Sequence, residues 1–181
     1  MFALCAIPVN HSVASAETVV ELPVIMYHSL LKSRTGAYIT SPAKFKSDLT
    51  WLKERGYTSV FVQDIIDHCE GRKALPDKPV LISFDDGHYN NYYYAFDILK
   101  ELGFKANINI IGCHSEFCST NEDRDNPNYS HLTWGEIKEM QESGIWEVGN
   151  HTYNMHKFQP RYGVSKMYNE SSLEYEKNLT H

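Results

Sequence analysis

The chain lacks the features that mark two common classes of protein. Its 181 residues contain no cluster of Lys and Arg, and its formal net charge is -6. The sequence therefore lacks the basic surface with which proteins bind nucleic acids or anionic lipids. No apolar run approaches the ~20 residues that a membrane-spanning helix needs. We therefore expect neither nucleic-acid binding nor a membrane span.

Cysteine is scarce as well, with four residues in the whole chain. Cys5 lies in an apolar N-terminal stretch, and the remaining three cannot form a complete disulfide framework because their number is odd. The spacing of Cys113 and Cys118 allows either a disulfide in an oxidising compartment or two free thiols. A zinc site is less favoured, because His114 is the only histidine between them.

The N-terminus resembles a short secretion signal. Residues 2–9 are mostly apolar, and the small and polar residues that follow end in Ala14-Ser15-Ala16, which matches an A-x-A cleavage site. No Lys or Arg precedes the apolar stretch, so an ordinary buried N-terminal segment is the alternative. We expect residues 1–16 to be a signal peptide, residues 17–181 to form the mature domain, and the protein to be secreted or attached to the cell surface.

The rest of the chain is typical of one globular domain of the α/β class. It is 42% hydrophobic and 22% charged overall, which is close to globular averages. Three times, a segment with apolar residues at helical spacing ends near a glycine and leads into a strand-like run. The strand-like runs are nearly continuous in apolar residues, as in a parallel sheet covered by helices. The expected helix–strand pairs are 42–55 with 57–62, 89–102 with 104–111, and 133–144 with 145–148, after a first strand at 24–27 and with another at 80–84.

Two groups of polar residues fall at the ends of expected strands. Asp85 and Asp86 follow the run 80–84, and His151 and His156 follow the run 145–148. Catalytic side chains in α/β folds lie just past the carboxyl ends of strands. Each group alone is a weak signal, since acids before a glycine are common in turns. Together, the two groups indicate one site.

These residue types suit metal-assisted hydrolysis. A catalytic zinc ion takes three protein ligands from His and carboxylates and leaves a position open for water. Two histidines five residues apart would be turned roughly 140° from each other on an α-helix, so His151 and His156 must converge from a loop, and Gly149 favours a turn there. One aspartate would complete the metal site. The other would be free to act as the base on water activated by the metal.

The same residues carry a family resemblance. Phe84-Asp85-Asp86-Gly87 and His151-Thr152, with His156 four residues later, resemble the first and second signatures of the polysaccharide deacetylases, also called NodB-homology domains or carbohydrate esterase family 4. The resemblance begins at Val24-Ile25-Met26-Tyr27-His28-Ser29 and continues through the segment 52–57. It covers most of the expected mature chain.

The resemblance implies a function and a role for each residue. Asp85 is expected to be the catalytic base, and Asp86, His151 and His156 are expected to bind a divalent metal, with zinc favoured over cobalt, nickel or manganese. The family removes N-acetyl groups from amino-sugar polymers such as peptidoglycan, chitin-like or poly-N-acetylglucosamine chains, and some members remove O-acetyl groups from xylan. Its partner is therefore an acetylated polysaccharide. For His28, a structural role is preferred.

The later signatures of the family are not found. Arg161-Tyr162-Gly163 lacks the proline of an Arg-x-x-Pro-Tyr/Phe segment, and Leu179-Thr180-His181 comes too early to be the late Leu-x-His. The expected fold is therefore the N-terminal part of a distorted (β/α) barrel of the NodB-homology type. An incomplete barrel would leave unpaired strand edges and exposed apolar surface. The alternative function is a catalytically incompetent fragment that binds only metal or glycan. The oligomeric state and the particular polysaccharide stay open.

Overall fold

The computed structural model describes residues 20–121, 125–157, 159 and 161–179. Its central feature is a parallel sheet in the order β1-β5-β6-β7, in which β4 pairs with the first half of β5. The short β2 and β3 form a separate parallel pair. In chain order the elements are β1 (Val24–Tyr27), β2 (Ser29–Leu30), β3 (Ile39–Thr40), α1 (Pro42–Glu54), β4 (Thr58–Val60), α2 (Val62–Cys69), β5 (Pro79–Phe84), the π-helical turn η1 (Asn91–Ala95), α3 (Phe96–Leu102), β6 (Ala106–Ile111), α4 (Gly112–Thr120), α5 (Trp134–Glu142), β7 (Trp146–Thr152) and α6 (Ser172–Leu179).

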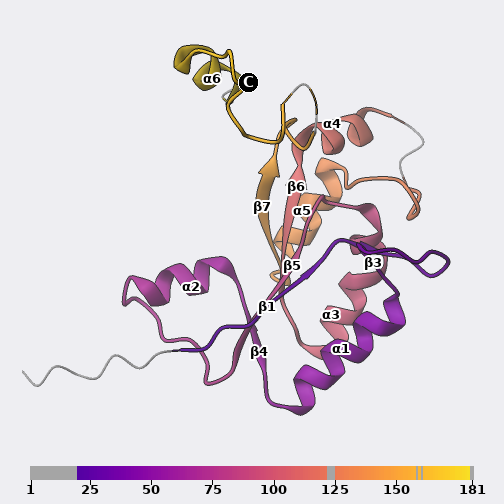
Figure 1. Ribbon diagram of the computed structural model, residues 1–181. Coiled ribbons are helices and arrows are strands. Elements are labelled where there is room, and N and C mark those ends of the chain that lie inside the picture. Colours follow the sequence, from indigo (N-terminus) through magenta and orange to yellow (C-terminus); the bar gives the residue numbers. More distant parts are fainter. Residues whose placement is uncertain (1–19, 122–124, 158, 160, 180–181) are drawn as a thin grey trace, which may run out of the picture.

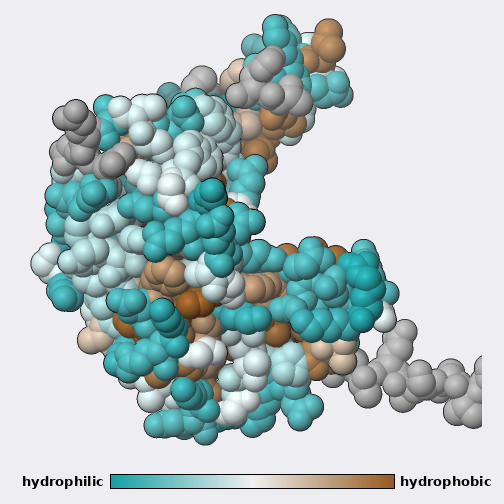
Figure 2. Space-filling view, turned by 180° about the vertical axis from the view of Figure 1, so that it is seen from behind, coloured by the Kyte–Doolittle hydropathy of each residue, from teal (hydrophilic) through white to brown (hydrophobic). Residues whose placement is uncertain are grey.

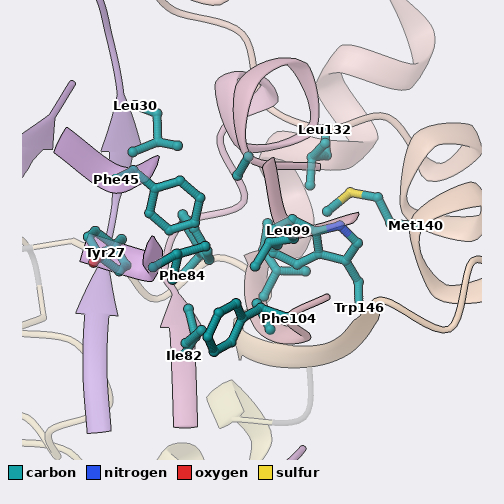
Figure 3. Close-up of a cluster of buried hydrophobic side chains, with 14 of the residues drawn as sticks. Tyr27, Leu30, Phe45, Ile82, Phe84, Leu99, Phe104, Leu132, Met140 and Trp146 are labelled. Carbon is teal, nitrogen blue, oxygen red and sulfur yellow. The ribbon is translucent and has the colours of Figure 1, made fainter. Parts of the chain in front are cut away.

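Helices α1, α3 and α5 cover one face of this sheet, as Figure 1 shows, and the hydrophobic core lies between them and the strands. Phe84, at the end of β5, is fully buried. Its ring centroid lies 5.4 Å from that of Tyr27, 5.5 Å from that of Phe45 and 5.2 Å from that of Trp146. All four side chains are labelled in the cluster of Figure 3. The expected α/β class and parallel sheet are confirmed, and the end of β5 is fixed by the core.

The expected helix boundaries hold where capping residues set them. Ser41 Oγ accepts a hydrogen bond from the backbone N–H of Lys44, and Pro42 occupies the first turn of α1. Thr133 and Glu136 form the expected capping box at the start of α5, with each side chain bonded to the backbone of the other residue. Local side-chain chemistry fixes both starts.

Helix α2 is missing from the expected set, and the strand expected over 57–62 is wrong at its end. The strand covers only Thr58–Val60, and α2 begins at Val62. The carboxylate of Glu147, on the distant β7, accepts hydrogen bonds from the backbone N–H groups of Val62 and Gln63 at 2.8 and 3.2 Å. The Asp64 carboxylate adds a local cap by accepting a hydrogen bond from the N–H of Phe61, but Glu147 lies 85 residues away and cannot be recognised from the local sequence pattern.

The segment after the acid pair also differs from the expected regular helix over 89–102. It begins with the π-helical turn η1 and continues as α3. A π turn holds one more residue than an α turn, and here both Asn90 and Asn91 are buried. The side chain of Asn90 accepts a hydrogen bond from the N–H of Leu30 and donates to the carbonyl of Pro127. Asn90 thus ties three separate segments together below the site.

Helix α4, which runs from Gly112 to Thr120, is also absent from the helices expected from the sequence. Both Cys113 and Cys118 lie on α4, and both are free thiols, as is Cys69. The thiol alternative is therefore confirmed and the disulfide alternative is wrong. The expected signal peptide, residues 1–16, lies outside the described residues. Among the helices that the structure describes, none is both long and apolar enough to cross a membrane.

The face of the sheet opposite the core is open. Val24 and Met26 of β1 point to this face and are 60% and 57% exposed. Seen from behind, the molecule is hollowed between the projecting helices α2 and α6 (Figure 2). The expected exposed apolar surface is confirmed at β1. Polar side chains of β5, β6 and β7 share this open face, and the site is built on it.

Candidate active site

The acid pair sits at the end of β5 in an unusual backbone conformation. Asp85 follows the last strand residue, and its N–H donates to the carbonyl of Tyr27 at 3.0 Å. Asp86 has a φ of 73°, the left-handed region, and is the one residue other than glycine with positive φ in the described part of the chain. Asp tolerates this region better than most residues, and strain of this kind gathers at functional sites. The turn points two adjacent carboxylates in different directions.

Gly87 makes the turn possible. Its φ is 70°, and a Cβ there would lie 3.0 Å from Cγ2 of Ile110 and 3.2 Å from the Cα of the same residue. The Gly87 carbonyl accepts a hydrogen bond from the N–H of Leu132 at 2.9 Å. Glycine is therefore required at this position by both conformation and space.

Asp86 and the two histidines converge. Oδ1 of Asp86 lies 3.7 Å from Nε2 of His151 and 3.8 Å from Nε2 of His156. One ligand atom from each of the three residues lies within 4.8 Å of the other two. Three donors bound to one zinc ion in tetrahedral geometry are about 3.4 Å apart. The structure brings together the three residues that were expected to hold a metal, at nearly the spacing that an ion requires.

The donors also suit a metal chemically. Oδ1 of Asp86 is buried and has no hydrogen-bond partner within the described part of the chain. A buried carboxylate oxygen without a partner is costly unless a cation satisfies it. Two imidazoles and one carboxylate are a ligand set typical of zinc. The residues present therefore fit a divalent ion.

His88 holds the other oxygen of Asp86. Its Nε2 lies 3.5 Å from Oδ2 of Asp86. The hydrogen bond from His88 and its charge, with the charges of His156 and His28, lower the pKa of Asp86 to about 2. The carboxylate is therefore ionised at neutral pH, the form that binds metal.

Two further histidines lie behind His88. The ring centroid of His131 is 4.9 Å from that of His88, and Nε2 of His131 is 3.1 Å from Nδ1 of His114. Burial lowers the pKa of His131 to about 3 and also lowers the pKa of His114. These two imidazoles are therefore neutral at pH 7 and form an uncharged packing layer behind the site.

Asp85 stands beside the metal-binding group but is held differently. Its Oδ1 accepts a hydrogen bond from Nδ2 of Asn109 at 2.9 Å, and its side chain is not among the three converging ligands. This arrangement leaves Asp85 available for proton transfer. Its role as base remains a prediction.

The histidines come from a strand and a short loop, which corrects one expectation. Strand β7 runs to Thr152, so His151 lies within it, and Gly149 is a strand residue rather than the start of a turn. The parallel partner of Gly149 is Asn109. The absence of a side chain at Gly149 makes room for the Asn109 amide, which explains the glycine without a turn.

The loop that carries His156 is tied to α4. The N–H of Cys113 donates to the carbonyl of Tyr153 at 2.8 Å, and Cys113 Sγ lies 3.4 Å from Oδ1 of Asn154. The hydroxyl of Thr152 accepts a hydrogen bond from the N–H of Met155 at 2.9 Å. A cavity of about 570 Å³ adjoins this loop, and His151 is among its lining residues.

Sequence reasoning missed two residues of the site and undervalued a third. His88 directly follows the acid motif, and its position in the sequence could have indicated a contact with Asp86. Asn109 lies in the alternation Asn107-Ile108-Asn109-Ile110, which marks one polar face of a strand. His28 is close enough for its charge to act on Asp86, and its ring centroid lies 4.8 Å from that of Tyr38.

Comparison with known proteins places this geometry in context. The family model described as polysaccharide deacetylase matches residues 72–179, more than half of the chain. A Bacillus subtilis protein named as a polysaccharide deacetylase, YxkH, is 33% identical over 133 residues, which are 73% of this chain and 42% of that protein. The poly-beta-1,6-N-acetyl-D-glucosamine N-deacetylase of Staphylococcus epidermidis is 31% identical over 119 residues, 66% of this chain and 39% of that protein.

A solved structure agrees. A de-N-acetylase from Aggregatibacter actinomycetemcomitans superimposes with a TM-score of 0.72 at 27% identity, over 87% of this chain and 69% of that chain. The chain spans less than half the length of the curated relatives it matches. The fold is therefore that of part of a larger deacetylase domain, consistent with a partial barrel.

Proposed function

Because the chain belongs to the polysaccharide deacetylase family, we propose that it carries the metal-binding and base residues of a hydrolase that removes N-acetyl groups from amino-sugar polysaccharides. The observation that carries the proposal is the convergence of Asp86, His151 and His156 beside a separately held Asp85. The similarity to a poly-beta-1,6-N-acetyl-D-glucosamine N-deacetylase favours poly-N-acetylglucosamine as the polymer. A signal peptide over residues 1–16 and an extracytoplasmic location, where such polymers occur, belong to the same proposal, as does the extent of the domain over 17–181.

The metal would be held by the three converging residues. Asp86 supplies a carboxylate that is ionised at neutral pH, and His151 and His156 each supply an imidazole nitrogen. When bound, a divalent ion polarises an acetyl carbonyl and makes a water molecule easier to deprotonate. Zinc is the favoured ion for this ligand set, ahead of cobalt, nickel and manganese.

Asp85 performs the proton transfer in this scheme. One carboxylate oxygen is engaged by Asn109, and the other can take a proton from the attacking water. The water oxygen forms a bond to the acetyl carbon, the bond from that carbon to the sugar nitrogen breaks, and the nitrogen takes up a proton. The products are acetate and a free amino sugar.

The open face of the sheet makes the site accessible to a polymer. The side chains of His151 and His156 are 32% and 52% exposed, whereas that of Asp86 is 17% exposed. A chain of sugars is too large for a closed cavity and needs a surface site of this kind. The exposed histidines are consistent with that requirement.

The experiment is acetate release from oligomers of β-1,6-linked N-acetylglucosamine by the zinc-loaded chain. We expect release by the unmodified protein and a loss of about 100-fold or more in Asp85→Asn, with zinc still bound. Asp85→Asn is nearly isosteric, so it serves as its own folding control. Zinc binding without acetate release from any acetylated oligomer would favour the alternative, a protein that binds metal or glycan without catalysis.

A further inference from the structure

We propose that Asn109 is a positioning residue for Asp85, and that Gly149 is required because it leaves space for the Asn109 side chain. The inference rests on the proposed role of Asp85 as base. It assigns a function to a polar residue of β6 that is neither a metal ligand nor the base. The three residues come from three neighbouring segments of the open face, Asp85 after β5, Asn109 in β6 and Gly149 in β7.

The first step is the hydrogen-bond geometry. Nδ2 of Asn109 donates to Oδ1 of Asp85 at 2.9 Å and approaches Oγ of Ser83 at 3.3 Å. Ser83 and Asp85 are two residues apart and point to the same face of the sheet. In the described part of the chain, Oδ2 of Asp85 has no hydrogen-bond partner. The amide therefore fixes one oxygen and leaves the other free to take a proton.

The second step is the chemistry of the donor. An amide N–H donates without carrying a charge or giving up a proton. Asn109 can therefore orient the carboxylate and stay unchanged through the reaction. A misplacement of about 1 Å in a reacting group costs on the order of 100-fold in rate, so a fixed carboxylate matters.

The third step is the space that Gly149 provides. A Cβ built on Gly149 would lie under 3.0 Å from Oδ1 of Asn109, closer than real Cβ atoms approach. The atom in the way is the end of a flexible side chain, so alanine at this position would push the Asn109 amide aside rather than break the sheet. Asn109 and Gly149 are register partners in the parallel pair β6–β7, which places this clash opposite the bond to Asp85.

The register pair two residues earlier in the same strands, Asn107 and Glu147, has a different role from Asn109 and Gly149. The Asn107 amide donates to the Glu147 carboxylate, which in turn caps α2. Both asparagines bind a carboxylate, but Asn107 stabilises a helix end whereas Asn109 holds the residue beside the metal ligands. Asn107 is therefore the matched control.

The test compares Asn109→Leu, which is nearly isosteric but lacks the donor, with the unmodified protein. We expect kcat for acetate release to fall between about 10- and 100-fold, with KM and zinc affinity each within about two-fold of the unmodified protein. Asn107→Leu should lower the unfolding temperature and leave kcat per folded molecule unchanged. A fall in zinc affinity equal to the fall in kcat would overturn the proposal, because a general loosening of the site would then explain it.

Gly149→Ala gives the second arm. It should lower kcat about as much as Asn109→Leu, and in an Asn109→Ala background it should have no further effect, because the side chain that it displaces is gone. Equal effects of Gly149→Ala in both backgrounds would contradict the inference. In an Asp85→Asn background, Asn109→Leu should likewise add nothing to the residual rate.

A readout that is independent of activity separates this inference from the proposed function. The side-chain amide protons of Asn109 should be protected from exchange in ¹⁵N NMR spectra and should lose that protection in Asp85→Ala. A chain that releases no acetate but shows this signal would overturn the proposed function and leave the contact between Asn109 and Asp85 standing. An unprotected Asn109 amide in an active protein would overturn the inference alone.

Discussion

The two segments that form the site are held in very different ways. The acid segment, residues 84–88, begins with the fully buried Phe84, and its backbone is hydrogen-bonded to Tyr27 and Leu132. The histidine segment, residues 151–156, is more exposed, since the His156 side chain is 52% exposed against 17% for Asp86. Its first two residues end β7 beside β6, and the loop after them is attached to α4 through the Tyr153 carbonyl.

This difference indicates that the two segments contribute to the site in different ways. A rigid acid segment keeps Asp85 and Asp86 in a strained turn that only a well-packed core can maintain. A looser histidine segment can adjust its two imidazoles around an ion. We therefore expect substitutions that disturb the backbone of the acid segment to lower stability, and substitutions of the histidines to weaken metal binding alone.

The largest expected effect is on metal affinity. His151→Gln and His156→Gln should each weaken zinc binding on the order of 100-fold or more, since even partners outside the ligand set are worth about 10- to 100-fold. The unfolding temperature of the metal-free protein should not change, because both side chains are substantially exposed. Zinc affinity is measured by competition with a chromophoric chelator, and unfolding is measured in EDTA. A clear loss of metal-free stability would remove the contrast between the two segments.

The next largest expected effect is a loss of folding stability caused by a substitution in the acid segment. Gly87→Ala should lower the free energy of unfolding by about 2–4 kcal/mol, because it combines a positive φ with a clash against the backbone of Ile110. Gly144→Ala is the matched control, since its φ is 68° but no atom lies within 4 Å of the added Cβ. It should lose only about 1 kcal/mol. Equal losses in urea titrations would show that the acid turn is not specially constrained.

A smaller effect should follow from Gly112→Ala at the start of α4. The added Cβ would lie 2.6 Å from Cδ2 of Tyr153, so the ring and the histidine segment must shift. We expect zinc affinity to fall about 10-fold with little change in stability, because a displaced ring is cheaper than a displaced backbone. Gly135→Ala in α5, where the nearest atom is 3.8 Å away, should leave zinc affinity unchanged. An unchanged affinity in Gly112→Ala would mean that α4 does not position His156.

The smallest expected effect concerns pH. The pKa of His131 is about 3 in the folded protein against 6.5 when exposed, because of its burial. Between these values the unfolded chain binds more protons, so stability is full above pH 6.5 and falls as the pH drops toward 3. Asp86 adds to this fall only below its ordinary value of 3.8.

His131→Gln should therefore flatten the stability profile between pH 6.5 and 4. His114→Gln should flatten it less, since its ring is less buried than that of His131. Urea unfolding of the metal-free protein at several pH values measures both effects. A profile of unchanged steepness in His131→Gln would contradict the assigned cause.

Sequence reasoning could group the candidate ligands because each group lies at or near the carboxyl end of a strand that local sequence predicts. The apolar run before Asp85 and the glycine-bounded helices are local signals, and parallel strands bring their carboxyl ends together. The parallel sheet was predictable for the same reason. So was the start of α5, because Thr133 and Glu136 bond to each other's backbone.

The rest depends on contacts between distant residues. Helix α2 begins where Glu147 of β7 caps it, and η1 forms where Asn90 bonds to two other segments. The hydrogen bond from Asn109 to Asp85 depends on β6 lying next to the end of β5, which local sequence does not show. Gly149 was predicted to be a turn residue. The Asn109 amide that needs the space at Gly149 belongs to another strand, so the sequence around Gly149 gives no sign of it.

The most direct test of the account is a zinc titration of Asp85→Asn and Asp86→Asn side by side with the unmodified protein. Both variants keep nearly the same size, and Asn tolerates the left-handed conformation of position 86. The account predicts one zinc ion per chain in Asp85→Asn with nearly unchanged affinity, and a loss on the order of 100-fold or more in Asp86→Asn. Equal losses in the two variants, or none in Asp86→Asn, would contradict the division between a base and a metal ligand.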